Sequence, residues 1–209
     1  MRLGTVFGSA VLLLCTFDAS AHHVMGGITP DTWTAGLLSG IGHPIIGLDH
    51  LAFVIAVGAG AAFVPRCWWW TPLVFILATV LGCLLKVAGV FLPLAEVVVT
   101  ASVVLLGAMV LSGRAFQPGL YIFLFAASGL FHGWAYGESI VGAEATPLVA
   151  YLTGFASIQY ALVLGVIWVV RSLWSANGPV AIQPRLIGGL AAGVGLALLI
   201  ENIESLIIA

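Results

Sequence analysis

The stretch GHPIIGLDHLAFVIAVG, residues 42–58, places two histidines and an aspartate in an otherwise apolar run. The run has the composition of a helix that enters a membrane. Imidazole and carboxylate groups are costly in such surroundings unless they pair with one another, bind an ion or face a cavity. We therefore take His43, Asp49 and His50 as candidate functional residues.

The composition of the whole chain supports this view of the run. Of its 209 residues, 62% are hydrophobic and 7% are charged, whereas soluble domains carry about 25% charged residues. Several segments reach the roughly 20 apolar residues that a helix needs to cross a bilayer. These features predict an all-α polytopic membrane protein whose surroundings are the lipid bilayer. A net charge of −2 says little about other partners, and no nucleic acid is expected among them.

The first 21 residues have the pattern of an export signal. Arg2 gives a short basic start, VFGSAVLLLC is a short apolar core, and ASA at 19–21 fits the small-x-small cleavage rule. We predict a cleavable signal peptide over 1–21 and a single membrane domain over 22–209. An uncleaved first helix is the alternative, and it leaves the topology unchanged.

Six hydrophobic spans follow, separated by proline, glycine and charged residues. The segment before them is expected to lie along the outer interface. Pro44 suits the first turn of the first span, where its missing N–H costs nothing. The predicted spans are 44–64, 71–91, 94–112, 119–137, 146–171 and 185–208.

The charged residues predict the orientation. With an exported amino terminus, Arg66, Arg114, Arg171 and Arg185 all fall on the cytoplasmic side, as the positive-inside rule requires. The expected location is the inner membrane of a bacterium, with both mature termini on the periplasmic side. Six acidic residues then map to the outer side, where they would concentrate cations or simply complement the inner arginines. They are Asp31, Glu96, Glu138, Glu144, Glu201 and Glu204.

Depth in the membrane relates the first span to the fourth. Asp49 and His50 would lie about 8–9 Å below the outer end of the first span. His43, two turns before His50, shares its side if the helix extends that far back. In SGLFHGWAYGESIVGAE, residues 128–144, His132 lies at a similar depth, with Tyr136 one turn above it and Glu138 near the exit.

The common depth predicts one shared site. Glycines at 129, 133 and 137 form a stripe of small residues that allows another helix to approach closely. Imidazoles accompanied by carboxylates suit a divalent transition metal, and Asp49 could orient an imidazole. Proton traffic and a structural role for the histidines are the alternatives.

The motifs HPIIGLDH and FHGWAYGES resemble the paired signatures of the HupE/UreJ family of small membrane permeases. The resemblance covers nearly the whole chain after the signal and implies six spans and uptake of nickel or cobalt, often in support of hydrogenases or urease. It carries over His43, Asp49, His50, His132 and Glu138 as metal residues. The family pattern commonly reads H-G-x-A-H-G-x-E, whereas this chain has Tyr136 in place of the second histidine, and a phenol is a poorer, harder ligand than imidazole.

Two further features could belong to a metal pathway. Cleavage after Ala21 would expose His22 at the amino terminus, followed by His23, and an amine with its own imidazole can chelate nickel or copper. Glu201 and Glu204 lie three residues apart near the outer end of the last span, on one face, where they could line an entrance. An ordinary interfacial location explains them equally well.

The function expected from these residues is a secondary permease for nickel or cobalt, not an enzyme. A zinc-dependent intramembrane hydrolase is one alternative, since three histidines and an aspartate could hold zinc with a water. A non-transporting metal-binding or assembly subunit of a larger membrane complex, with copper or zinc as further metals, is another. A homo-oligomer is also compatible with the sequence.

Overall fold

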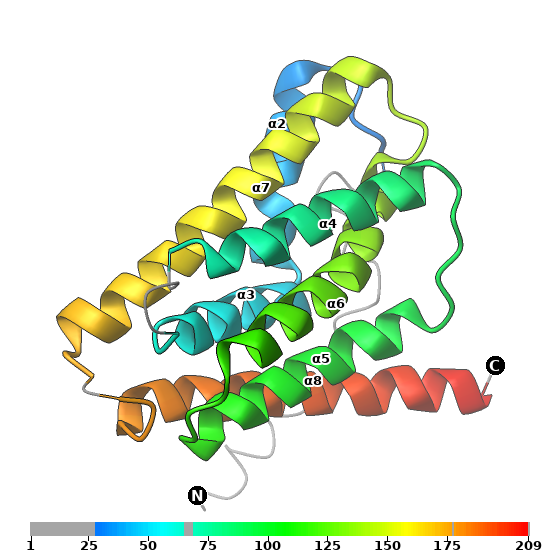
Figure 1. The fold of residues 1–209 in the computed structure, drawn as a ribbon. Coiled ribbons are helices and arrows are strands. Elements are labelled where there is room, and N and C mark those ends of the chain that lie inside the picture. Colours follow the sequence, from blue (N-terminus) through cyan, green and yellow to red (C-terminus); the bar gives the residue numbers. More distant parts are fainter. Residues whose placement is uncertain (1–27, 65–68, 177, 209) are drawn as a thin grey trace, which may run out of the picture.

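The computed structural model describes residues 28–64, 69–176 and 178–208, so the expected signal peptide, His22 and His23 lie outside the described residues. The described ranges are helical and contain no strand, which confirms the all-α prediction there. A 3₁₀ turn, Glu138–Ile140, follows α6, and a π-helical segment, Val169–Leu173, extends α7. The α-helices are α2 (Trp33–Ile46), α3 (Leu48–Ala61), α4 (Thr71–Val87), α5 (Ala95–Ser112), α6 (Pro118–Gly137), α7 (Ala145–Trp168) and α8 (Ile182–Ile208) (Figure 1).

The expected first span is broken. Instead of one helix over 44–64, α2 ends at Ile46 and α3 starts at Leu48, with their axes bent by 77°. Pro44 lies inside the last turn of α2, so its expected place at the start of the span is wrong. Its missing N–H weakens that turn, and Gly47 then leaves the helix with an extended backbone. A Cβ at Gly47 would lie 2.7 Å from Cδ2 of His50, so this glycine makes room for the imidazole.

The other helices pack in close pairs around α3. The closest pairs are α4 with α6, α5 with α8, and α2 with α7, while α3 lies among them and contacts α5, α7 and α8 (Figure 1). The predicted glycine stripe is confirmed as a packing surface, because a Cβ at Gly133 would overlap the backbone of Thr79 on α4. The pairs therefore meet backbone to backbone.

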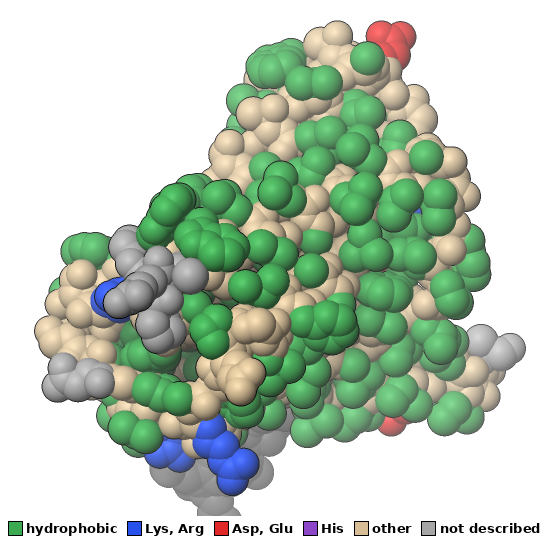
Figure 2. All heavy atoms as spheres, viewed as in Figure 1, with side chains coloured by type: hydrophobic (Ala, Val, Ile, Leu, Met, Phe, Trp, Pro, Cys, Tyr) green, Lys and Arg blue, Asp and Glu red, His purple; other side chains and the backbone are tan. Residues whose placement is uncertain are grey.

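The distribution of polarity is inverted relative to a soluble protein. Histidine, aspartate and glutamine side chains are buried, whereas large apolar side chains such as Phe123 and Leu190 are exposed. Figure 2 shows hydrophobic side chains over most of one face, with most of the visible lysine and arginine side chains towards its lower left. A surface of this kind is suited to lipid.

Fewer than six helices meet the length and hydropathy expected of a span. Within the described residues, α5, α7 with its π-helical extension, and α8 do so, and the bent pair α2/α3 makes a fourth if it counts as one broken span. Helix α4 is apolar but shorter, with 17 residues. The chain is thus a helical membrane protein, and the number of six spans stays a prediction.

Candidate metal site

A pair of buried histidines lies at the centre of the bundle. His50 comes from the first turn of α3 and His132 from α6. Their Nδ1 atoms are 3.0 Å apart, and the exposed fractions of the two residues are 3% and 0%. The two histidine clusters therefore meet, as their common depth predicts.

Ser102 on α5 determines which nitrogen of His132 carries the proton. The Ser102 hydroxyl donates to the carbonyl of Val99 at 2.6 Å, so its oxygen must accept from the Nε2–H of His132 at 2.9 Å. The Nδ1 atom of neutral His132 then has a lone pair, and the proton in the contact between the histidines belongs to Nδ1 of His50. A nitrogen with a free lone pair is what a metal ion requires.

His43 reaches the same cluster from α2. Its Nδ1 lies 2.9 Å from the hydroxyl oxygen of Tyr151 and 3.0 Å from that of Ser139. Because the Tyr151 hydroxyl donates to the carbonyl of Tyr136 at 2.8 Å, it accepts from His43, whose Nε2 is then the nitrogen that carries the lone pair. The helix of His50 does not extend back to His43, so the condition for a shared helix face is not met, yet the bend leaves their ring centroids 5.7 Å apart.

Asp49 is buried beside His50. One carboxylate oxygen accepts the backbone N–H of His50 at 2.8 Å, and the other lies 3.9 Å from its Nδ1. A carboxylate in the first turn of α3 is favoured by the helix dipole. These distances show a hydrogen bond to the backbone of His50, and the predicted role of Asp49 in orienting an imidazole stays a prediction.

Tyr136 lies between the two histidines of the broken span. Its ring centroid is 4.3 Å from that of His50 and 5.1 Å from that of His43, and the residue is fully buried. Its hydroxyl has no hydrogen-bond partner among the described residues. An unmade hydrogen bond in the interior costs about 1–3 kcal/mol, and a water or an ion beside this hydroxyl would remove that cost.

The acidic candidates lie away from this buried cluster. Glu138 forms an ion pair with Lys86, and its side chain is 59% exposed. The Lys86 ammonium also lies 3.8 Å from the centroid of the Trp134 ring. Glu201 and Glu204 are exposed near the carboxyl end of α8. These three carboxylates are therefore at the surface of the bundle.

No three histidine, cysteine, aspartate or glutamate side chains converge to hold a metal ion in the described part of the chain. The imidazoles brought together are those of His50 and His132, with the ring of Tyr136 close by. A metal bound here would complete its coordination with weaker oxygen donors, such as water. The site is thus suited to a weakly held ion.

The sequence analysis did not identify Ser102, Ser139 or Tyr151. A usable signal for Ser102 was present, because it lies about as deep in the third predicted span as His50 does in the first. Tyr151 and Ser139 gave no comparable signal, since tyrosine and serine are ordinary residues near the end of a membrane helix. Their contacts with His43 depend on how α2 and α7 pair.

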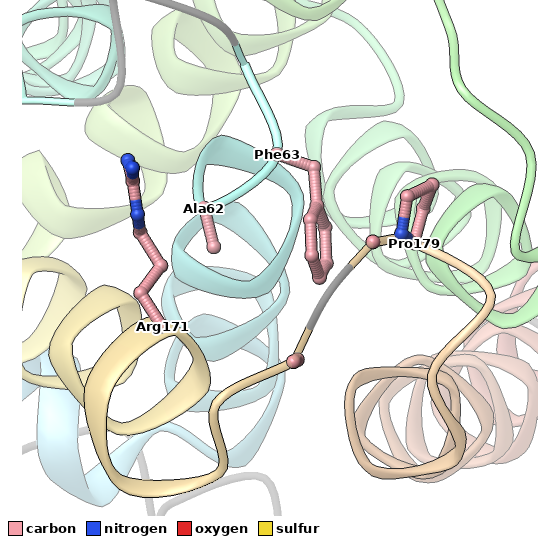
Figure 3. A pocket seen from close by; sticks show the side chains of 6 residues that line it. Ala62, Phe63, Arg171 and Pro179 are labelled. Carbon is pink, nitrogen blue, oxygen red and sulfur yellow. The ribbon is translucent and has the colours of Figure 1, made fainter.

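A separate cavity of about 410 Å³ lies where α3 ends, beside the π-helical segment. Figure 3 shows Ala62 and Phe63 between Arg171 on one side and Pro179 on the other. The lining contains none of the histidines. This cavity and the histidine cluster are therefore different places.

Comparison with known proteins assigns the chain to a family. The family described as HupE / UreJ protein matches residues 10–198. Protein HupE of Rhizobium leguminosarum bv. viciae is 31% identical over 168 residues, which cover 79% of this chain and 85% of that protein. No solved structure matches. The family match spans both histidine motifs, and the chain belongs to the HupE/UreJ family.

Proposed function

We propose that this chain is a secondary permease that carries a divalent transition metal, nickel or cobalt, across the bacterial inner membrane, and that it is not an enzyme. The observation that carries the proposal is the pair His50 and His132. Two imidazole nitrogens that bind one ion at about 2.0–2.1 Å and at a right angle lie about 2.9 Å apart. The two Nδ1 atoms are 3.0 Å apart.

The empty pair is neutral, which suits the membrane interior. One proton lies between two imidazoles, so the pair itself carries no charge when the ion is absent. Binding of the ion replaces this proton, which leaves the site or moves to the other nitrogen of His50. His43 supplies a third imidazole nearby, and Asp49 offsets part of the charge of the ion.

Two protein imidazoles with water in the remaining positions hold an ion less firmly than a closed four-ligand site. A permease needs such weak binding, because it must release the ion that it transports. Tyr136 places its unpartnered hydroxyl where it can accept from or donate to such a water. We assign Tyr136 to the ion pathway on this ground.

The approach to the site is assigned to the exported side. Glu138, Glu201 and Glu204 would attract cations there. If the mature chain starts at His22, its amine and imidazole, with His23, would capture the ion first. Both termini then lie on the periplasmic side.

The test is a titration of the purified mature protein with Ni²⁺, Co²⁺, Cu²⁺ and Zn²⁺, beside the variants His50→Ala and His132→Ala. We expect weak, reversible binding of Ni²⁺ or Co²⁺ that each variant abolishes. Ser128→Ala, a change at a buried polar residue one turn from His132, is the matched control and should bind normally. Uptake of radioactive nickel into cells should likewise be lost in His50→Ala and His132→Ala and be normal in Ser128→Ala.

The same titration separates the alternatives. A zinc hydrolase would retain stoichiometric Zn²⁺ through purification and cleave a lipid or peptide. An assembly subunit would bind metal without uptake and would purify with stoichiometric partners. Binding that is unchanged in both histidine variants would refute the proposal.

A further inference from the structure

A second buried polar atom lacks a partner, and it lies on α7. Among the described residues, the buried side-chain oxygen and nitrogen atoms without a hydrogen bond are the hydroxyl of Tyr136 and Oε1 of Gln159. Gln159 is fully buried, and its Nε2 donates to the carbonyl of Phe155 at 3.1 Å. Its amide oxygen is therefore an unused acceptor in the apolar interior.

The position of Gln159 relates it to the histidine site. It lies eight residues after Tyr151, the partner of His43, which is about 12 Å along a helix axis. This displacement is towards the end of α7 that is followed by Arg171. An ion that leaves the histidines in this direction would pass Gln159.

Phe155 contacts both residues that carry the unpartnered atoms. Its ring centroid is 5.5 Å from that of Tyr136 and 5.5 Å from that of Tyr151, and the residue is fully buried. One turn further along α7, the Gln159 amide bonds to the carbonyl of this same phenylalanine. Phe155 thus links the two residues, because its ring packs on Tyr136 and its backbone carbonyl accepts from Gln159.

The helices around Gln159 leave it between two zones of close packing. On one side, Gly40 of α2 meets the backbone of Tyr151 and Phe155. On the other, Gly58 of α3 meets Val163 and Val166. The break at Gly47 lies beside His43 and His50, and broken helices at membrane depth are found where protein or a water-filled path surrounds them.

From these observations we infer that Gln159 is a second, inner binding position for the transported cation, about two helical turns along α7 from the tyrosine that contacts His43. The inference rests on the proposed permease function. The amide oxygen accepts a hydrogen bond from a water in the hydration shell of the ion, which a neutral side chain does without trapping the cation. No bond to protein forms or breaks.

The experiment compares Gln159→Met, which keeps the length and removes the amide, with Gln159→Glu, which keeps an acceptor oxygen. Each variant is measured in three ways: equilibrium Ni²⁺ binding, Ni²⁺ flux into proteoliposomes, and Tm. We expect Gln159→Met to bind Ni²⁺ within about twofold of wild type and to lose flux roughly tenfold to a hundredfold, the loss typical of one interaction with a charged group. Its Tm should not fall, because the removed oxygen had no partner and the Phe155 carbonyl still accepts the backbone N–H of Gln159 in the helix. Gln159→Glu, whose carboxylate holds a cation more firmly, should bind Ni²⁺ at least as tightly as wild type and restore part of the flux.

Three results would overturn the inference. Normal flux and normal binding in Gln159→Met would remove Gln159 from the pathway and leave the permease proposal intact. A lower Tm with reduced binding in that variant would show that Gln159 supports the structure. A wild-type protein that neither binds nor moves Ni²⁺ would refute both the permease proposal and the role of Gln159.

Discussion

Ser102→Ala should weaken metal binding although Ser102 is not proposed as a ligand. The hydroxyl donates to the carbonyl of Val99 and accepts from Nε2–H of His132. Without it, the buried Nε2–H is unpaired, at a cost of about 1–3 kcal/mol. His132 avoids this cost by moving the proton to Nδ1, the atom that faces His50. Loss of an outer partner of a metal-binding histidine typically costs about 10–100-fold in affinity, so we expect Kd for Ni²⁺ or Co²⁺ to rise by that factor.

The assay is calorimetric titration, with Co²⁺ absorption as a second readout. Ser112→Ala is the matched control, because Ser112 is on the same helix and makes the same kind of bond, to the carbonyl of Met109 at 2.7 Å, without contact to His132. The nitrogen-15 chemical shifts of His132 report the tautomer directly and should change in Ser102→Ala alone. An affinity within twofold of wild type, or an equal loss in Ser112→Ala, would refute the reasoning about the tautomer.

Three further predictions concern the residues around the site. Gly133→Ala should lower the free energy of unfolding by about 1–3 kcal/mol or more, because the new Cβ meets the Thr79 backbone. Gly193→Ala, which has open space around it, should leave the free energy of unfolding unchanged. Thermal unfolding in detergent measures both variants. Glu138→Gln should change the free energy of unfolding by less than about 1 kcal/mol, because its ion pair is largely exposed. Reduced uptake at low nickel in this variant would therefore show that Glu138 attracts the cation. Unchanged uptake would argue against that role. Tyr136→Phe should leave Tm unchanged or raise it, since the hydroxyl has no partner, while metal affinity falls; a clear drop in Tm would show that the hydroxyl is bonded.

The class of the fold and the meeting of the two histidine motifs were predictable from the sequence. Hydropathy reports the solvent that a segment prefers, and helix geometry converts position into depth. Depth alone was enough to predict that His50 and His132 meet, because a narrow bundle holds few residues at any one level. Depth likewise predicted that Tyr136 lies beside the cluster.

Other features depend on tertiary contacts that no local pattern encodes. Pro44 is equally compatible with the first turn of a helix and with the last turn before a break, and only the packing of α2 on α7 selects the second. Lys86 forms its ion pair with Glu138 because α4 packs against α6, and no local pattern around Lys86 singles out that carboxylate. Each helix has several apolar faces that are similarly suited to packing, so the sequence does not show which face pairs with which helix.

The three tight helix pairs have a mechanical consequence. Each pair meets through close backbone contacts at glycine, so sliding of one helix past the other would drive side chains into the facing backbone. His43 belongs to the α2/α7 pair, His132 to α4/α6 and Ser102 to α5/α8, while His50 belongs to α3. The histidine cluster is thus the place where the three helix pairs and α3 all meet. Any rotation of one pair against the others separates these groups, so the hold on an ion and the shape of the protein must change together.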